Sequence, residues 1–414
     1  MAASPPSVNP GPRTRLLRDN PGFRALCVSR AVSCVGDGIT TAALVLLAAA
    51  QHGPTGVSLL LVANALPRFG GPLAGVFVDR VPTRRLITCC DLASAAVIGL
   101  IALTVPPLPL LLGLIVVAGA LSTLRGPAGR SLVPVLVSPT DRGPANALFG
   151  LGRTLQLAAG PAVGGLLSIG PGGVRTALAV DVATFVIAAV LLARLPAFQP
   201  VRDPSVITGV WAEAVAGIRH VATNRPVRIL ILTMFALVVF ATVDNVALVF
   251  LTGYQLSAGP AGYGLAASAF GIGMTLTSLA CTRLARGRSP VALLAVAIAA
   301  TGVGMILAGL APTLVVVVVA QLIAGAGNSG ENIGFDTAVQ NAVPRPLLGR
   351  VFGTLSTAAQ LGSGVAYVAG DLLLDVAGPR VTFVLAGAGT LLVLLWLAPA
   401  LRTGPVGALR VAPR

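Results

Sequence analysis

Long apolar stretches alternate with short polar connections along nearly the whole chain. They recur from residue 23 to residue 400, and each has roughly 20 residues, the length of helix that crosses the hydrocarbon core of a bilayer. Gly and Pro pairs, such as Gly53-Pro54 and Gly378-Pro379, separate neighbouring stretches as turn signals. The pattern therefore predicts twelve transmembrane helices, at residues 23–50, 57–78, 86–105, 109–129, 145–168, 174–194, 228–253, 261–282, 290–310, 313–335, 350–374 and 380–400.

The apolar stretches favour helices over a transmembrane barrel. In lipid, every backbone N–H and C=O group must be paired by the protein itself, so only helices and closed barrels span a bilayer. A barrel strand would alternate apolar and polar residues over about ten positions, whereas residues 315–319 and 391–397 are continuously apolar. The sequence therefore predicts an all-α membrane protein.

Short motifs recur about half a chain apart. Phe-Gly at residues 149–150 recurs at 352–353, and Gly-Ala at 119–120 recurs at 325–326. Such repeats predict two pseudo-symmetric six-helix bundles with a substrate site between them, near the middle of the membrane. The predicted organisation is an N-terminal tail at 1–22, a bundle at 23–194, a linker at 195–227, a second bundle at 228–400 and a C-terminal tail at 401–414.

The linker is the longest polar connection in the chain. Within it, Trp211, Val215, Ile218 and Val221 recur at helical spacing. This spacing predicts a short amphipathic helix that lies on the membrane surface.

The charge of the chain is sparse but strongly basic. Charged residues make up 10% of the chain and hydrophobic residues 55%, which leaves too few charges for the surface of a water-soluble domain, and the net charge is +15. A nucleic-acid partner is not expected, because the basic residues are scattered over many short loops. Loops on one side hold nearly all of them, and the opposite loops contain only Arg175 and Arg380. By the positive-inside rule, both termini are expected in the cytoplasm, which requires an even number of crossings.

Residue usage also argues against an enzyme or a cofactor protein. The chain has no lysine, so it has neither the lysine of a P-loop ATPase nor that of a Schiff base. Its five cysteines have no CxxC spacing and it has only two histidines, so no metal site is expected. A Gly-rich motif at 325–330 lies inside a predicted membrane helix, which does not fit a dinucleotide-binding turn.

The connection after the second predicted helix carries a dense charged motif. Residues 75–85 read Gly-Val-Phe-Val-Asp-Arg-Val-Pro-Thr-Arg-Arg. The motif resembles the loop signature G-x-x-x-D-R-x-G-R-R of the major facilitator superfamily, with Pro82 in place of the usual Gly and Thr83 in place of the first Arg. The resemblance implies a cytoplasmic gate, whose residues would be Gly75, Asp79, Arg80, Arg84 and Arg85, with Asp91 and Arg350 as partners by analogy.

The fifth predicted helix contains a second motif, Gly-Pro-Ala-Val-Gly-Gly at residues 160–165. It resembles the end of the antiporter signature of the same superfamily, G-P-x-x-G-G, although Gln156 replaces the expected upstream glycine. The resemblance implies an exporter. The alternative is that small residues let helices pack closely, and both interpretations can hold. The residues concerned are Gly160, Pro161, Gly164 and Gly165.

Further motifs in a fixed order resemble one branch of the superfamily. They are Gly-Asp at 36–37, Gly-Pro-Ala-Gly-Arg-Ser-Leu-Val-Pro at 126–134, Ala-Asn-Ala-Leu at 145–148, Gln-Asn-Ala-Val-Pro at 340–344 and Gly-Arg-Val-Phe-Gly at 349–353. Together they are similar to the drug:proton antiporter branch, which includes enterobactin exporters and macrolide efflux proteins. The resemblance implies the major facilitator fold and proton-coupled export of a broad range of substrates.

Two carboxylates inside predicted helices are candidates for proton coupling. Ionisable residues in a bilayer are costly and commonly functional. Asp37 lies midway along the first helix and Asp244 deep in the seventh. Desolvation can hold such a carboxyl neutral, and a neighbouring cation can ionise it. The alternative for Asp37 is a structural ion pair with Arg30 or Arg68.

Five further polar residues are candidates for the substrate cavity. In other exporters of the superfamily a helix-four arginine takes part in coupling, so the resemblance implies this role for Arg125. The alternative is an interfacial arginine whose head group reaches the cytoplasm. The others are Asn245, beside Asp244, and a polar cluster on the tenth helix, which could instead form a gate or an ion pair between the halves: Asn328, Glu331 and Asn332.

Three other charged residues are not expected in the site. Asp181 and Asp371 are expected near outer helix ends, where a solvated carboxylate is unremarkable. Arg153 is expected near the inner face in a structural role.

The leading interpretation is a secondary active transporter that exports small amphipathic or lipophilic molecules, such as drugs, antibiotics, siderophores or other metabolites, by proton antiport with alternating access. Its partners would be the small molecule, protons and the lipid bilayer. The expected setting is a monomer in a bacterial plasma membrane. The alternatives are proton-coupled nutrient uptake on the same fold and a membrane sensor or scaffold that transports nothing.

Overall fold

The computed structural model describes residues 14–71, 77–78, 81–169, 172–194, 219, 221–284, 290–344 and 347–403. The described residues form helices joined by short turns, with no strand among them. Nine of these helical segments are long and apolar enough to cross a membrane. The predicted amphipathic helix of the linker lies largely outside the described residues, as do Gly75, Asp79 and Arg80 of the predicted gate.

Two of the nine segments make two crossings each. Pro21–Gly70 and Leu348–Leu397 are both 50 residues long, which is more than twice the length needed to span a bilayer. The first contains α2 (Pro21–Ala65), which bends at Gly53, where φ is 60°. The second lies in α15 (Leu348–Thr403), which bends at Gly378, where φ is 73°. A positive φ is readily accessible only to glycine. The chain therefore turns at the two Gly-Pro pairs that the sequence predicts as turns.

The remaining crossing, which is the fifth along the chain, is a broken helix. It consists of α6 (Arg142–Ala158) and α7 (Gly160–Leu167), which are too short to qualify singly and are separated only by Ala159. Pro161 lies in the first turn of α7, where a proline is tolerated because the amide it lacks has no partner within that helix. With this segment, the described residues contain the twelve predicted crossings, and the predicted all-α fold is confirmed.

The N-terminal half surrounds the first crossing. It begins with the short helix α1 (Thr14–Asp19), and Asn20 then caps α2 by accepting a hydrogen bond from the backbone N–H of Phe23, 2.8 Å away. Helix α2 packs against α8 (Val174–Ala193), α5 (Leu108–Leu136) and the α6–α7 segment, and α4 (Thr83–Thr104) packs against α5 and α8. Two short 3₁₀ turns, η1 (Leu66–Gly70) and η2 (Pro139–Asp141), complete this half.

The C-terminal half repeats this arrangement. Its first crossing combines α10 (Arg225–Ala241), α11 (Asp244–Phe250) and a π-helical turn, η4 (Leu251–Gln255). It continues through α12 (Gly259–Leu284), α13 (Pro290–Leu310), α14 (Leu314–Ala342) and α15. Helix α14 packs between α12 and α13, and α15 packs against α10 and α13.

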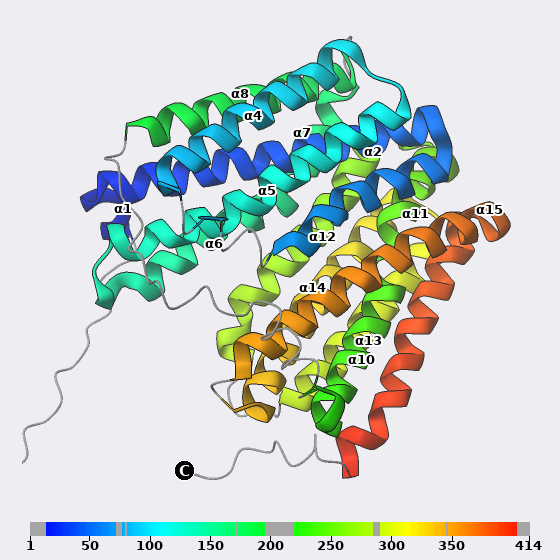
Figure 1. Ribbon diagram of the computed structural model, residues 1–414. Helices are drawn as coiled ribbons and strands as arrows, with labels where there is room; N and C mark the ends of the chain where they lie inside the picture. The colour runs from blue at the N-terminus through cyan, green and yellow to red at the C-terminus, as the bar shows by residue number, and fades with distance from the viewer. Residues whose placement is uncertain are drawn as a thin grey trace, which may run out of the picture.

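The two halves meet at one end and separate at the other (Figure 1). At the end that carries the turns at Gly53 and Gly378, one cluster of buried apolar side chains includes residues of both halves, such as Ala48 and Val246. Toward the end with α1 and the last residues of α15, each half has a core of its own. We call these the joined end and the termini end. The space between the halves therefore opens toward the termini end.

Hydrogen bonds across the joined end hold it closed. The hydroxyl of Ser58 donates to the carbonyl oxygen of Tyr367 at 2.7 Å, and the hydroxyl of Thr55 donates to the carboxylate of Asp371 at 3.1 Å. Both bonds join the second crossing to the eleventh, so this end is sealed by polar pairs as well as by apolar packing.

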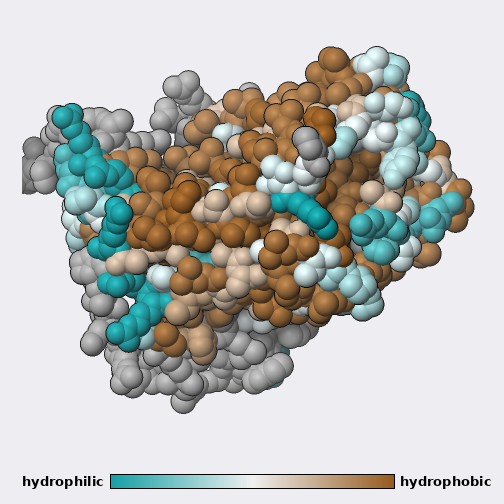
Figure 2. Space-filling view, turned by 90° about the horizontal axis from the view of Figure 1, so that it is seen from above, coloured by the Kyte–Doolittle hydropathy of each residue, from teal (hydrophilic) through white to brown (hydrophobic). Residues whose placement is uncertain are grey.

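The outer surface is suited to lipid. Figure 2 shows a broad hydrophobic face with most hydrophilic residues gathered toward its two ends. On the surface of the molecule as a whole, large apolar side chains are strongly exposed, including Leu103 at 80%, Val376 at 89% and Leu395 at 67%. Such a continuous apolar surface is too large for a soluble monomer and fits a membrane-embedded protein.

Candidate functional site

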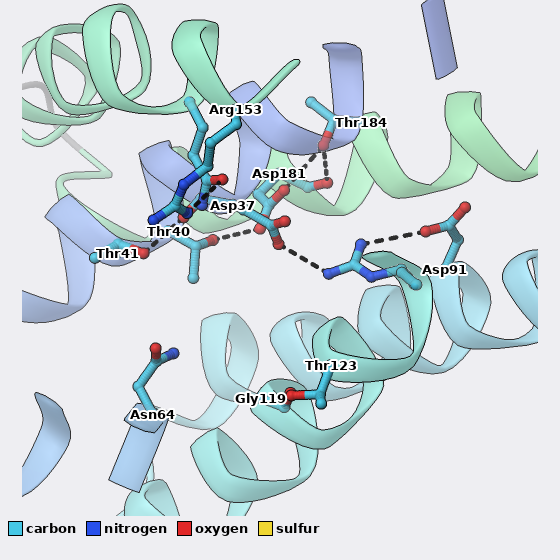
Figure 3. Close-up of polar contacts among 12 residues, drawn as sticks. Asp37, Thr40, Thr41, Asn64, Asp91, Gly119, Thr123, Arg153, Asp181 and Thr184 are labelled. Carbon is cyan, nitrogen blue, oxygen red and sulfur yellow. Dashed lines mark hydrogen bonds and ion pairs between the residues drawn. The ribbon is translucent and has the colours of Figure 1, made fainter. Parts of the chain in front are cut away.

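A buried ion-pair cluster lies in the middle of the N-terminal half. Arg125 of α5 donates to Asp37 of α2 at 3.0 Å and to Asp91 of α4 at 3.2 Å. The side chains of Arg125 and Asp91 are 3% and 2% exposed, whereas that of Asp37 is 19% exposed. Figure 3 shows Asp37 and Asp91 on separate helices, each with an interaction to the guanidinium between them. One cation thus serves two carboxylates, and Asp37 is the more accessible one.

The cluster corrects two of the alternatives considered for these residues. Arg125 does not extend to an interface, because its head group is enclosed between two carboxylates and lies 4.6 Å from the ring centre of Phe185. Asp37 forms its ion pair with this arginine rather than with Arg30 or Arg68. The helix-four arginine and the helix-one aspartate, predicted as separate candidates, are direct partners.

A third carboxylate lies next to Asp37, and sequence reasoning missed it. Asp181 of α8 was expected to be solvated near a helix end, but it is 0% exposed. The hydroxyls of Thr40 and Thr184 donate to its carboxylate, at 2.5 Å and 2.9 Å (Figure 3). Gly36 makes this approach of α2 to α8 feasible, since a Cβ there would collide with the carboxylate of Asp181 and the hydroxyl of Thr184.

A polar cavity of about 380 Å³ opens beside this cluster, within the N-terminal half. We call it the first cavity. Asp37, Arg125 and Asp181 all line it, together with Arg30, Arg68 and Arg153. Asp91 is absent from this lining and lies behind Arg125. Arg153, which was not expected in the site, thus lines this cavity, and its structural role stays a prediction.

A second cavity, of about 410 Å³, lies between the two halves. It brings together the proton-coupling and substrate-cavity candidates predicted in the C-terminal half, which come from α11 and α14: Asp244, Asn245, Asn328, Glu331 and Asn332. From the N-terminal half, Thr41, Arg68 and Arg153 line both cavities. The two cavities are therefore adjacent parts of one central space.

Two carboxyls in the second cavity have no cationic partner among the described residues. Asp244 is 7% exposed and Glu331 is 5% exposed. Gln321, a neutral side chain, lines the same cavity. One oxygen of Glu331, Oε1, has no hydrogen-bond partner. Buried carboxyls without a cation are costly in a membrane and commonly mark a functional site.

The antiporter-like motif joins three crossings. Gly160 lies against Gly38 of α2, where a Cβ on Gly160 would come within 2.6 Å of the Cα of Gly38. On the other side of α7, Gly165 faces Gly264 of α12, with 3.0 Å between a Cβ on Gly165 and the Cα of Gly264. Close helix packing, one of the two interpretations of this motif, is thus a feature of the fold.

The same broken helix also forms a hydrogen bond to the other half. The backbone N–H of Ala162, at the start of α7, donates to the hydroxyl of Ser268 of α12 at 2.8 Å. The break at Ala159 leaves this N–H without a partner in its own helix. The motif therefore lies in the seam between the halves.

The described part of the predicted gate lies at the termini end. Arg84 and Arg85 are in the first turn of α4, and Arg350 is in the first turn of α15. Asp91 is two turns further into α4, in the buried cluster with Arg125. The gate itself stays a prediction, since Asp79 and Arg80 are outside the described residues.

Twelve crossings in two similar halves, with a charged space between them, define a membrane transporter of the major facilitator type. The chain matches the sequence model of the family described as "Transmembrane secretion effector" over residues 17–402. The chain therefore belongs to this family of major facilitator transporters.

Two curated relatives are similar along most of the chain, and a third is similar along about half of it. It is 27% identical over 387 residues to the "Uncharacterized MFS-type transporter YfiS" of Bacillus subtilis (strain 168), covering 90% of this chain and 91% of that protein. It is 28% identical over 369 residues to the "Multidrug efflux pump Tap" of Mycolicibacterium fortuitum, covering 84% and 88%. It is 27% identical over 207 residues to the "Putative bacilysin exporter BacE" of Bacillus subtilis (strain 168), covering 49% and 52%.

Solved structures share the fold at low sequence identity. The nucleoside transporter NupG has a TM-score of 0.72 and 12% identity, covering 92% of this chain and 99% of that one. A bacterial homologue of the lysosomal transporter Spinster, in an inward-facing and unoccupied conformation, has a TM-score of 0.66 and 15% identity, covering 97% and 99%. These likenesses establish the architecture alone.

Proposed function

We propose that this protein exports small amphipathic or lipophilic molecules across a bacterial plasma membrane by proton antiport. The observation that carries the proposal is the cluster of Arg125 with two carboxylates, one of which reaches the central space. The printed names of two relatives, a multidrug efflux pump and a putative bacilysin exporter, support export as the direction.

The cluster supplies a means of proton coupling. A proton that binds Asp37 removes its negative charge and weakens its bond to Arg125, and the guanidinium then depends on Asp91 for charge compensation. When the proton leaves, the three-group cluster re-forms. Because the groups belong to α2, α4 and α5, protonation changes an interaction among three helices. A switch of this kind biases a protein between two conformations.

The side chains around the cluster favour this role for Asp37. It is the carboxylate of the ion-pair cluster that lines the first cavity, whereas Asp91 is shielded. Asp244 stays a second candidate for coupling, because it also lines the central space and has no cation beside it in the described part of the chain.

The expected orientation makes this an inward-facing conformation. If both termini are cytoplasmic, as the positive-inside rule predicts, the open termini end faces the cytoplasm. A substrate would then enter the central space from inside the cell. Export requires the joined end to open and the termini end to close, with the predicted gate residues at the closing end.

The test is efflux of labelled or fluorescent lipophilic compounds from cells expressing the wild type or Asp37→Asn, with and without a protonophore. We expect efflux by the wild type to stop when the protonophore is added, and Asp37→Asn to lose most of the efflux. Asp375→Asn is the matched control, because Asp375 is an exposed carboxylate of α15 outside both cavities.

Three results would contradict parts of the proposal. Wild-type efflux that persists with the protonophore would exclude proton coupling. Loss of efflux in Asp244→Asn but not in Asp37→Asn would move the coupling site to the C-terminal half. Cells that accumulate more compound than controls would reverse the direction and favour uptake.

A further inference from the structure

The second cavity has opposite charges on its two walls. Among the described residues, its wall from the N-terminal half contains two arginines, Arg68 of η1 and Arg153 of α6, and no acidic residue. The described part of its wall from the C-terminal half contains two acidic residues, Asp244 and Glu331, and no basic residue. The described residues form no ion pair across this space, since the only two ion pairs among them involve Arg125.

The two arginines keep donors free for a ligand. Arg68 donates to Asn64 at 2.8 Å, and Arg153 donates to Gln156 at 3.0 Å, so each is positioned by a neutral side chain of its own helix turn. A guanidinium has five N–H donors, so most of them stay available. Arg153 also lies within electrostatic range of Arg68 and Arg30, and of one carboxylate, Asp37. An anionic group bound beside Arg68 and Arg153 would offset the repulsion between these like charges.

The acidic wall, in turn, lacks a compensating positive charge among the described residues. Glu331 is 5% exposed and its Oε1 has no hydrogen-bond partner among the described residues, and Asp244 forms no ion pair with any of them. A buried carboxylate is costly unless a cation compensates it. No described residue supplies that cation. A cationic group of a ligand can therefore compensate the charge of Asp244 and Glu331.

Apolar side chains also line the cavity, and they include Leu157, Leu237 and Phe270 with two methionines, Met234 and Met274. Methionine side chains adapt to ligands of different shape. The cavity therefore combines a basic wall and an acidic wall with an apolar lining.

We infer that the second cavity binds zwitterionic amphipathic molecules, with an anionic group at Arg68 and Arg153, a protonated amine at Asp244 and Glu331, and an apolar body between them. This inference rests on the proposed transport function and names its substrate class.

Binding to the purified full-length protein in lipid nanodiscs tests the inference without requiring transport. The probes are terminal amino acids with an apolar chain: aminohexanoic, aminooctanoic and aminoundecanoic acid. Each is compared with its amide, which keeps only the cation, with its N-acetyl form, which keeps only the anion, and with the doubly blocked neutral form. We expect one chain length to bind best, and its zwitterion to bind about tenfold or more tightly than either singly blocked form.

Two charge-removing variants locate the ends of the ligand. In Arg153→Gln, the advantage of the zwitterion over the amide should shrink, because the anion then keeps only Arg68 as a partner. In Glu331→Gln, the advantage of the zwitterion over the N-acetyl form should shrink, because the amine then keeps only Asp244. Asp375→Asn should keep both preferences. Each comparison is a ratio of the affinities of two ligands for the same variant. A general loss of stability lowers both affinities and leaves the ratio unchanged.

The possible outcomes separate this inference from the proposed function. If the amide or the N-acetyl form binds as tightly as the zwitterion, or if none of the probes binds, the inference is wrong. If the zwitterion binds selectively but proteoliposomes do not move it in response to a pH gradient, the inference stands and the proposed proton antiport fails for this ligand.

Discussion

Arg125 compensates two carboxylates at once, and this sharing makes the cluster sensitive to the loss of any member. Arg125 is 3% exposed, and Asp91 has no other ion-pair partner among the described residues. Removing one partner of a buried ion pair leaves an uncompensated charge, which costs more than the pair contributes. The stability of the cluster therefore depends on each of its three members.

A prediction at this scale concerns Arg125→Gln. We expect this variant to lose about 3–5 kcal/mol of stability, because Asp91 is then buried without a cation, and to lose transport. The measurement is the melting temperature of the purified protein in detergent. Adding Asp91→Asn should recover part of the loss, because the carboxylate that is then left without a cation is Asp37, which is more exposed than Asp91.

The control for this prediction is Arg130→Gln. Arg130 is on the same helix as Arg125 but is exposed, and an exposed arginine contributes little to stability. If Arg125→Gln had the same melting temperature as the control, the buried ion pairs of Arg125 with Asp37 and Asp91 would not stabilise the protein as described.

The sequence identifies the charged candidates but not their surroundings. Asp37, Arg125, Asp244 and Glu331 are each conspicuous as a charge within an apolar stretch. Their environment was less predictable. Asp181 is buried only because Gly36 lets α2 approach α8, and nothing in the sequence around residue 181 indicates what faces it.

At the scale of elements, the broken fifth crossing packs closely against both halves of the molecule. Its glycines contact α2 on one side and α12 on the other. Small residues allow helix backbones to approach closely and pack by van der Waals contact. A change in this seam therefore acts on both halves.

We predict that Gly264→Ala lowers both the melting temperature and the transport rate. The new Cβ would collide with the carbonyl oxygen of Pro161 and lie 3.1 Å from the Cα of Gly165. These are backbone atoms, which cannot move aside as a flexible side chain can. The measurements are thermal unfolding and efflux of the same labelled compound.

Gly150→Ala is the matched control, since a Cβ at Gly150 of α6 meets nothing within 4 Å. Alanine is a better helix former than glycine by about 1 kcal/mol, so this control should be neutral or slightly stabilising. If Gly264→Ala matched the control in both measurements, the seam would not be as tightly packed as described.

At the scale of the whole molecule, the joined end determines which side of the central space is closed. The second and eleventh crossings are held together there by Thr55 with Asp371 and by Ser58 with Tyr367. Alternating access, as proposed, requires these contacts to break in each cycle.

A cross-link across the joined end should therefore stop transport. We predict that Thr55→Cys with Asp371→Cys, in a background without the native cysteines, forms a disulfide or reacts with a short thiol cross-linker. Efflux should stop on cross-linking and recover on reduction. Each single-cysteine variant serves as the control. Normal efflux by fully cross-linked protein would show that this end does not need to open.

Much of the fold is determined by local properties that the sequence displays directly. The length and apolar character of each stretch fix the number of crossings, because lipid requires each one to pair its own backbone. The turns at Gly53 and Gly378 are equally local, since only glycine adopts their positive φ readily. The sequence by itself therefore determined the twelve-crossing architecture and most of the charged residues of the site.

The tertiary structure alone decided which of these residues meet. Arg125 and Asp37 are 88 residues apart in the chain, and Thr40 and Asp181 are 141 apart. The direction in which the central space opens and the opposite charges on its walls depend on how the two halves lie against each other. These features arise from contacts between distant helices, and the pattern along a single helix does not specify its neighbour.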